Sequence, residues 1–192
     1  IKADILFSVS RFDHACGLPF FNAGFNLANE FQVWAGHLDS GGSIEQDLND
    51  LMTSPLFPIS LSSIGGLKQW GDFIAGEEFE LREGIRVLTA ALNNPAGATG
   101  YRVEYSGKSL GYISNTGHSP DVPDETVLAL IENCDLVIYD SYYYDEEVTD
   151  GELRGHSTWQ EGLRLCQAAG VKRLAAFQHH PDRLDNELEQ VQ

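Results

Sequence analysis

The sequence predicts a layered α/β fold, on three observations. Apolar runs rich in β-forming residues alternate along the 192 residues with segments whose apolar residues recur at helical spacing, which is typical of strands and helices packed in layers. A hydrophobic content of 42% is enough to bury a substantial core. No repeat, low-complexity stretch or linker interrupts the sequence. We therefore expect a single domain over residues 1–192.

The first part of the chain predicts two strands and two helices. Asp4–Ser8 and Gln32–Ala35 are short apolar runs that predict strands, and Ala15–Asn29, rich in apolar and small residues, is compatible with a helix between them. Helical spacing of apolar residues predicts a second helix over Ser43–Met52, with its first residue as the N-cap. The turn-rich segment Pro55–Trp70 predicts a loop or lid.

The middle of the chain predicts three strands and a helix. The strands are expected at Ile85–Leu92, Gly100–Tyr105 and Ser109–Ser114. Ser106-Gly107-Lys108 is expected to join the last two as a hairpin, because Gly supports the backbone of a tight turn. A proline followed by two acidic residues marks the start of a helix over residues 123–133.

The last part predicts strand, helix and strand in that order. Leu136–Tyr139 is a buried strand that ends at Asp140. The segment Thr158-Trp-Gln-Glu161 matches a capping box, so a helix is expected from there to Ala169, ending at Gly170. Arg173–Phe177 predicts the final strand, and an acidic helix is expected after residue 181.

Composition excludes several classes of partner. The chain has 29 acidic and 12 basic residues, a formal charge of −17. Nucleic-acid affinity comes largely from Lys and Arg on phosphates, so neither a nucleic acid nor an anionic membrane is expected as a partner. Solubility is the plainer explanation of the charge. No apolar run reaches about 18 residues, and the three cysteines (Cys16, Cys134, Cys166) are widely spaced and expected to be reduced. We expect a cytoplasmic protein.

Polar residues that could form a site follow several predicted strands. A rigid sheet can aim the side chains of such loops into one cleft. Taken singly, each residue has an ordinary structural explanation, and it is their joint order along the chain that suggests a site. The residues are Asp13, His14, Asn94, Asn115, His118, Asp140, His156, Gln178, His179 and His180.

Their order resembles the metallo-β-lactamase superfamily, in the branch that includes RNase Z-like and cyclic-nucleotide phosphodiesterase-like hydrolases. Residues 9–14 (Val-Ser-Arg-Phe-Asp-His) resemble the family's metal loop, His-x-His-x-Asp-His. Residues 94–102 (Asn-Pro-Ala-Gly-Ala-Thr-Gly-Tyr-Arg) resemble a stretch in which a metal-binding His precedes Pro and then Gly-Tyr-Arg. Residues 115–118 (Asn-Thr-Gly-His) resemble the family's Asp-Thr-x-His loop, whose Asp bridges both metals.

The resemblance continues to about Arg183. Residues 136–140 match the family's following strand, and residues 155–158 (Gly-His-Ser-Thr) match a motif whose His assists phosphodiester cleavage. Residues 177–181 (Phe-Gln-His-His-Pro) resemble the closing segment Phe-His-His-Asp-Pro. The resemblance implies an αββα sandwich of four layers. It also implies strands ahead of Ile5, so we expect either upstream sequence or a partner to cover that edge.

The resemblance further implies that most metal ligands have been replaced. Only Asp13 and His14 keep the family's residue at their positions. Valine has no lone pair and arginine carries only donors, so neither can ligate Zn²⁺ or Fe. Arg11 is expected to pair with Asp13, which would otherwise lack a counter-charge. The replaced positions are Val9, Arg11, Asn94, Asn115 and Gln178.

These replacements suggest a domain that has lost dinuclear hydrolysis, because the activated bridging hydroxide of such enzymes requires both metals. We interpret the chain as serving a binding, regulatory or structural role without a cofactor. The expected partner is a protein or an upstream domain, and a homo-oligomer is a further option. His156 is then either a vestigial general acid or a structural residue at the start of the helix at Thr158.

Two alternatives stay open. One Zn, Mn or Fe ion on Asp13, His14 and His179 would make the chain an active phosphodiesterase-like hydrolase. Alternatively, the replaced site could form a pocket for a small anionic metabolite, since Arg and amide groups bind phosphate without a metal. The residues of that pocket would be Arg11, Asn94, Asn115, His118, Asp140, Gln178 and His180.

Overall fold

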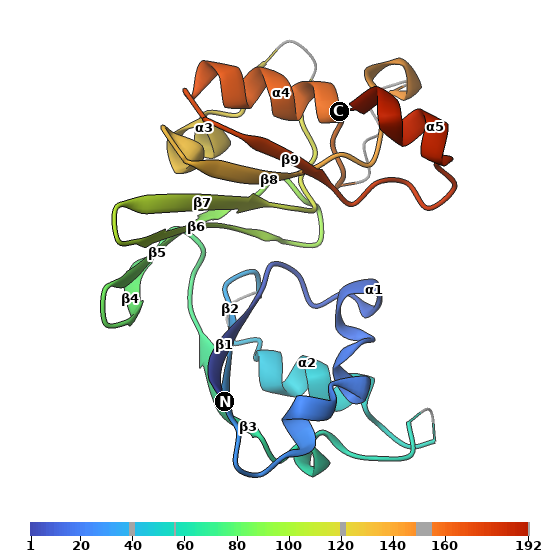
Figure 1. The fold of residues 1–192 in the computed structure, drawn as a ribbon. Helices are drawn as coiled ribbons and strands as arrows, with labels where there is room; N and C mark the ends of the chain where they lie inside the picture. Colours follow the sequence, from blue (N-terminus) through green and yellow to red (C-terminus); the bar gives the residue numbers. More distant parts are fainter. Residues whose placement is uncertain (39–40, 56, 120–121, 149–154, 192) are drawn as a thin grey trace. The chain divides into compact units, whose positions relative to one another are not determined.

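Contacts along the chain divide it into two compact units, Ile1–Ile74 (unit 1) and Ala75–Gln192 (unit 2). The structure is a computed structural model (Figure 1), in which unit 1 is coloured blue to blue-green and unit 2 green to red. Each unit is described by itself, and the expectation of a single domain stays a prediction. The structure describes residues 1–38, 41–55, 57–119, 122–148 and 155–191.

Unit 1 is built on a parallel sheet of three strands. The strands are β1 (Lys2–Phe7), β2 (Glu30–Ala35) and β3 (Leu67–Asp72), in the order β1-β2-β3. Helix α2 (Ile44–Leu51) contacts β2 and β3. A parallel sheet needs such cover because its strands carry apolar residues on both faces. The buried core of unit 1 includes Val33, Ala35, Ile44, Leu48, Leu61 and Ile64.

The segment between β1 and β2 differs from its prediction. A single helix over Ala15–Asn29 is wrong. The structure has α1 (Phe12–Ala15) and two 3₁₀ turns, η1 (Leu18–Phe20) and η2 (Asn22–Phe25). Pro19 lies in η1, where it removes a backbone donor and favours a short turn over a continuous helix.

The predicted loop over Pro55–Trp70 is also wrong in part, because its last residues belong to β3. A further 3₁₀ turn, η3 (Leu61–Ser63), precedes that strand. Gly71 within β3 would place a Cβ 2.5 Å from a ring atom of Trp34 on β2, so the glycine makes room for that ring. Glycine lowers local β propensity, and here tertiary packing overrides it.

The first turn of α2 is capped from a neighbouring strand. Ser43 is the N-cap residue, as predicted, but its side chain makes no cap hydrogen bond. The backbone N–H of Ile44 instead donates to Oδ1 of Asp72 over 3.0 Å. A carboxylate at this position also suits the positive end of the helix dipole.

Unit 2 contains a mixed sheet of six strands in sequence order, β4 to β9. Pairing is antiparallel from β4 through β7 and parallel from β7 through β9. The strands are β4 (Glu78–Arg82), β5 (Ile85–Ala91), β6 (Thr99–Tyr105), β7 (Lys108–Ile113), β8 (Leu136–Asp140) and β9 (Leu174–Phe177).

Two features of this sheet bear on the predictions. Strand β4 was not predicted, although its residues Glu-Phe-Glu-Leu-Arg alternate polar and apolar as a half-buried strand does. The predicted hairpin between β6 and β7 is confirmed. Its two turn residues, Ser106 and Gly107, have φ values of 48° and 72°, as a type I′ turn requires.

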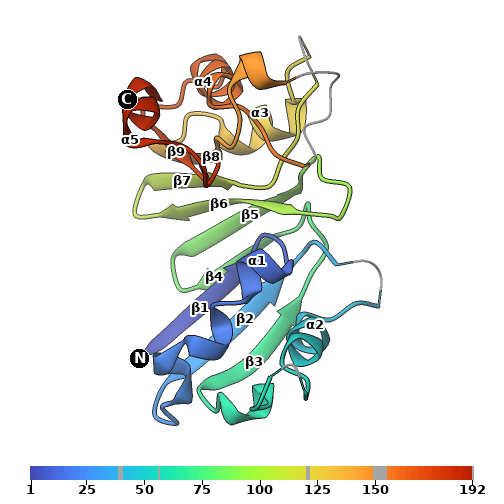
Figure 2. The ribbon, with the colours of Figure 1, turned by 90° about the vertical axis from the view of Figure 1, so that its right-hand side faces the viewer.

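Helices α3 (Glu125–Ile131) and α4 (Trp159–Ala168) contact each other and cover one face of this sheet (Figures 1 and 2). Asp124 caps α3 by accepting from the backbone N–H groups of Thr126 and Val127. Thr158 caps α4, as the sequence predicted, by accepting from the N–H of Glu161. The short α5 (Asp185–Leu188) and η5 (Glu189–Val191) follow β9, and η4 (Asp145–Glu147) follows β8. The core beneath α3 and α4 includes Leu92, Ile113, Val127, Ile131, Val137, Tyr139 and Leu165.

In the described part of the chain, no helix has the length and apolar character needed to cross a membrane.

A glycine inside α4 makes room for the ring of Tyr139. A Cβ at Gly162 would lie 2.5 Å from Cδ1 and 2.9 Å from Cγ of this buried tyrosine. We expect Gly162→Ala to destabilise the protein by about 1–3 kcal/mol, although alanine favours a helix by about 1 kcal/mol. Urea unfolding followed by circular dichroism measures the change. Gln167→Ala on the exposed side of the same helix is the control, with a change within about 0.5 kcal/mol. A gain in stability from Gly162→Ala would contradict this packing.

Candidate functional site

The predicted site residues of unit 2 gather around Asp140, at the end of β8. Its carboxylate is completely buried. Oδ2 accepts from the backbone N–H of Asn115 (2.8 Å) and lies 3.0 Å from Nδ1 of His156. Oδ1 accepts from the backbone N–H groups of Ser157 (3.2 Å) and Tyr142 (3.3 Å). Several partners of this kind are what allow a carboxylate to be buried. Asp140 therefore ties three loops together.

Asp140 also fixes the orientation of His156. A carboxylate only accepts hydrogen bonds, so Nδ1 of His156 is the protonated nitrogen. The imidazole stacks on the ring of Tyr142, with centroids 4.4 Å apart and planes at 19°. Tyr142 in turn meets His180 edge-on at 4.8 Å. His156 is thus held by Asp140, and capping of α4 falls to Thr158.

Three residues at replaced ligand positions lie together in the same network. Nε2 of Gln178 donates to Oδ1 of Asn115 over 3.3 Å, and Nδ2 of Asn94 donates to the backbone carbonyl of Asn115 over 2.9 Å. Nδ2 of Asn115 donates to Oγ of Ser114, and the Asn115 side chain is completely buried. Asn115 and Gln178 both have left-handed backbones, with φ of 56° and 62°. Such conformations persist where surrounding contacts hold them.

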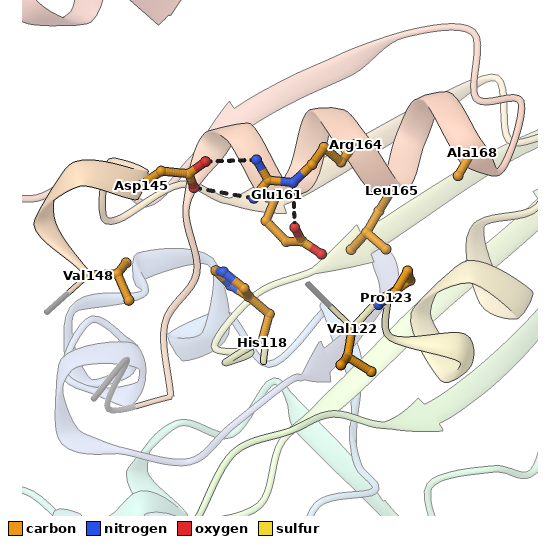
Figure 3. Close-up of a pocket in the computed structure, with 9 residues that line it drawn as sticks. All are labelled: His118, Val122, Pro123, Asp145, Val148, Glu161, Arg164, Leu165 and Ala168. Carbon is orange, nitrogen blue, oxygen red and sulfur yellow. Dashed lines mark hydrogen bonds and ion pairs between the residues drawn. The ribbon is translucent and has the colours of Figure 1, made fainter. Parts of the chain in front are cut away.

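His118 connects to the Asp140 network through Ser157. Its Nδ1 lies 2.9 Å from Oγ of Ser157, and that oxygen lies 3.0 Å from the hydroxyl of Tyr139. Burial lowers the pKa of His118, and the negative charge of Glu161 opposes this only in part. The imidazole lines a pocket of about 470 Å³ (Figure 3). The other lining residues are Val122, Pro123, Asp145, Val148, Glu161, Arg164, Leu165 and Ala168.

The predicted site residues of unit 1 follow β1. Val9 is buried. Nε and Nη2 of Arg11 donate to Oδ1 (3.2 Å) and Oδ2 (2.8 Å) of Asp13, which confirms the pairing expected from charge balance. Nε2 of His14 lies 3.5 Å from Oδ2 of Asp13. Partial burial raises the pKa of Asp13, but the hydrogen bond from Arg11 and the charges of His14 and Arg11 outweigh it, so the net shift is downward.

Comparison with known proteins decides the family. A family model described as the beta-lactamase superfamily domain matches residues 2–180. The chain belongs to the β-lactamase superfamily. It is 30% identical over 105 residues to ribonuclease Z of Gemmatimonas aurantiaca, a match that covers 55% of this chain and 29% of that protein. It is 32% identical over 91 residues to ribonuclease Z of Sulfurisphaera tokodaii, covering 47% and 28%.

Within the superfamily the chain is similar in part to ribonuclease Z, as the sequence motifs implied. The matched segments amount to less than a third of either ribonuclease Z, at 29% and 28% of their lengths.

Solved structures establish the fold. The metallo-β-lactamase fold protein YhfI from Bacillus subtilis is similar with a TM-score of 0.72 at 16% identity, covering 98% of this chain and 70% of that one. The short form of human tRNase Z gives a TM-score of 0.67 at 16% identity, covering 92% and 72%. The predicted α/β fold of metallo-β-lactamase type is therefore confirmed.

Taken unit by unit, the side chains at the predicted metal-ligand positions are poor ligands for a dinuclear metal centre. Oδ1 of Asn115 already accepts from Gln178, and both oxygens of Asp13 accept from Arg11. A guanidinium carries only donors, and the valine at position 9 has no lone pair. Within each unit, the described residues contain no group of three or more His, Cys, Asp or Glu side chains arranged to hold a metal ion.

Sequence reasoning missed the residues that support this site. Tyr142 stacks on His156, and Tyr139 and Ser157 connect to His118. Tyr139 and Ser157 lie in segments that match the family, but no motif assigned these side chains a role, and Tyr142 lies outside the motifs. Glu161 was interpreted only as part of a capping box, but its side chain accepts from Arg164, three residues further along α4. The i,i+3 spacing of an acid and an arginine was the available signal for that pair.

Proposed function

We propose that this chain is a degenerate metallo-β-lactamase domain that has lost dinuclear hydrolysis and acts by binding. The observation that carries the proposal is the hydrogen bond from Gln178 to Asn115. Both residues occupy positions that hold metal ligands in the family. In this chain the Gln178 amide donates to Oδ1 of Asn115, so the acceptor at position 115 already has a protein donor in place of a cation.

Electrostatics supports the same conclusion in unit 2. The backbone N–H of Asn115 donates to the buried carboxylate of Asp140. An aspartate at 115, as in the active family, would place a second buried carboxylate beside the first. Two cations would offset that charge. An asparagine has nearly the same shape and no charge, so it suits a metal-free site.

The metal loop of unit 1 has changed in a matching way. Arg11 carries a permanent positive charge where the family has a histidine, and its guanidinium occupies both oxygens of Asp13. Asp13 is thereby supplied with a cation from the protein itself. A positive side chain at this position disfavours a bound dication, because the two like charges would repel.

The role left to such a domain is binding, regulation or structural support. The formal charge of −17 disfavours a nucleic-acid or anionic-lipid partner. We propose a protein partner, or a small anionic metabolite held by the amides of unit 2. The competing function is a hydrolase that uses a single metal on Asp13, His14 and His179.

Turnover of bis-p-nitrophenyl phosphate separates these functions. With added Zn²⁺, Mn²⁺ or Fe²⁺, we expect the protein to release p-nitrophenol no faster than the metal alone, because the bridging hydroxide of the family needs both metals. His14→Ala is the matched variant and should give the same baseline. Metal-dependent turnover that disappears in His14→Ala would establish the single-metal hydrolase and overturn the proposal.

A further inference from the structure

The pocket in Figure 3 is lined by a carboxylate, Glu161, of which the described residues bond only one oxygen. The side chain of Glu161 is only 9% exposed. Its Oε2 accepts from Nε of Arg164 over 2.8 Å, and no described residue donates to its Oε1. Figure 3 shows that second oxygen turned away from Arg164, on the side of the pocket with Leu165 and Val122. This oxygen therefore offers the pocket an acceptor that a ligand could use.

The pocket also presents a hydrogen-bond donor, His118. The hydroxyls of Tyr139 and Ser157 lie 3.0 Å apart, and we assign the donor to Tyr139 because Ser157 Oγ is the acceptor that the described residues offer its buried proton. Ser157 then has its own proton to donate to Nδ1 of His118, at 2.9 Å. Nδ1 is therefore the acceptor nitrogen of a neutral imidazole, and the proton is on Nε2. Burial lowers the pKa of His118, which agrees with a neutral ring.

The charges of the described residues around the pocket do not balance. Arg164 is bonded to two carboxylates, since Nε donates to Glu161 and Nη1 donates to Asp145 over 2.7 Å. Burial raises the pKa of Asp145, but hydrogen bonds from Arg164 and Thr158 outweigh it and the net shift is downward. Two negative charges thus share one positive charge beside a neutral imidazole. One further cation would make the group neutral.

Among the described lining residues, Val122, Val148, Leu165 and Ala168 give the pocket apolar surface. We propose that this pocket binds a small organic ammonium ion, with its charged nitrogen on Oε1 of Glu161, a hydrogen-bond acceptor on Nε2 of His118 and an apolar group against Leu165. The pocket contains none of the family's metal-ligand positions. The inference therefore goes beyond the proposed function and does not depend on it.

A matched series of three compounds tests the proposal. 2-Amino-1-phenylethanol supplies the ammonium, a hydroxyl and a phenyl ring. 1-Phenylethane-1,2-diol replaces the ammonium with a neutral group, and mandelate replaces it with a carboxylate. NMR titration of the ¹⁵N-labelled chain at pH 7.5 measures each affinity. We expect saturable shifts at residues lining the pocket, and binding of the ammonium about tenfold or more tighter than of the diol, because charge-assisted hydrogen bonds are the stronger ones.

Two variants locate the binding site. Glu161→Gln is expected to weaken binding of 2-amino-1-phenylethanol by about tenfold or more. Ala168→Leu fills the apolar side of the pocket without touching a charged group and should also weaken it. Glu125→Gln, an equal charge change at an exposed position on α3, is the control and should leave affinity unchanged. The same spectra report whether each variant is folded, and Ala168→Leu decides the matter if Glu161→Gln is not.

The proposal is overturned by any of three results. The first is the absence of saturable shifts with the ammonium compound, and the second is binding of mandelate as tight as that of the ammonium compound. The third is unchanged affinity in Glu161→Gln, or in Ala168→Leu if Glu161→Gln does not fold. Detection of p-nitrophenol release in the turnover assay would overturn the proposed loss of hydrolysis and leave this pocket unaffected.

Discussion

Asn115→Asp is expected to destabilise the protein by about 3 kcal/mol at neutral pH, because it buries a charge with no cation to offset it. Asn115 is completely buried, and its backbone N–H donates to the carboxylate of Asp140. The substitution also removes the amide donor that bonds to Ser114. Aspartate and asparagine have nearly the same shape. A fall in the free energy of unfolding would therefore measure the electrostatic cost of the buried charge.

The pH dependence of this variant has a definite sign. Burial raises the pKa of an aspartate at position 115 in the folded protein above its unfolded value of about 3.9. The folded state then holds the proton more tightly than the unfolded state does. The loss of stability is therefore absent at a pH below the unfolded pKa. It grows as pH rises toward the folded pKa. Urea unfolding at pH 4 and pH 7 measures the difference.

Asn93→Asp is the matched control, since it makes the same change at an exposed position one residue before Asn94. Its effect should stay within about 0.5 kcal/mol. If Asn115→Asp were as stable as the unmodified protein at pH 7, position 115 would accommodate a carboxylate without metal. The explanation that Asn115 avoids a second buried charge beside Asp140 would then be wrong.

Asp140→Ala is expected to cost about 3–5 kcal/mol. The substitution leaves the backbone N–H groups of Asn115 and Ser157 buried without an acceptor, and it frees the ring of His156. Urea unfolding measures the loss, and the imidazole resonances of His156 report whether its single tautomer is lost.

The control for Asp140→Ala is Asp182→Ala, whose side chain is 90% exposed. It should change stability by no more than about 0.5 kcal/mol. A loss below about 1 kcal/mol in Asp140→Ala would mean that the carboxylate does not organise these loops, and that each loop is held by other contacts.

The sequence predicted the elements of unit 2 better than those of unit 1, because the signals in unit 2 lie in short local stretches of sequence. Leu136–Asp140 is an apolar run, and the turn at Ser106 and Gly107 matches its required backbone. Strand β3, in contrast, depends on pairing with β2 and on the fit of Gly71 against Trp34. Contacts of that kind leave no periodic pattern in the sequence.

The candidate site was predicted only where a motif marked it. Family motifs indicated Asn115 and Gln178, which lie 63 residues apart and form a hydrogen bond in the structure. The chain from Tyr139 through Ser157 to His118 was not predicted, because a serine between a tyrosine and a histidine has no sequence signature. The pocket at Glu161 was not predicted either, because its lining residues form no sequence motif. The Glu161 carboxylate stands out because its side chain is 9% exposed and only its Oε2 accepts from Arg164. Both observations require the three-dimensional structure.

The metal content of the purified protein tests the loss of the dinuclear centre most directly. Protein is purified without chelator from medium supplied with Zn, Mn and Fe, and its metals are measured by mass spectrometry. The positive control restores the family ligands through Val9→His, Arg11→His, Asn94→His, Asn115→Asp and Gln178→His. We expect far less than one ion per unmodified chain and a regain of metal in the control. Stoichiometric Zn, Mn or Fe in the unmodified chain, lost in His14→Ala or His179→Ala, would contradict the loss of the metal site.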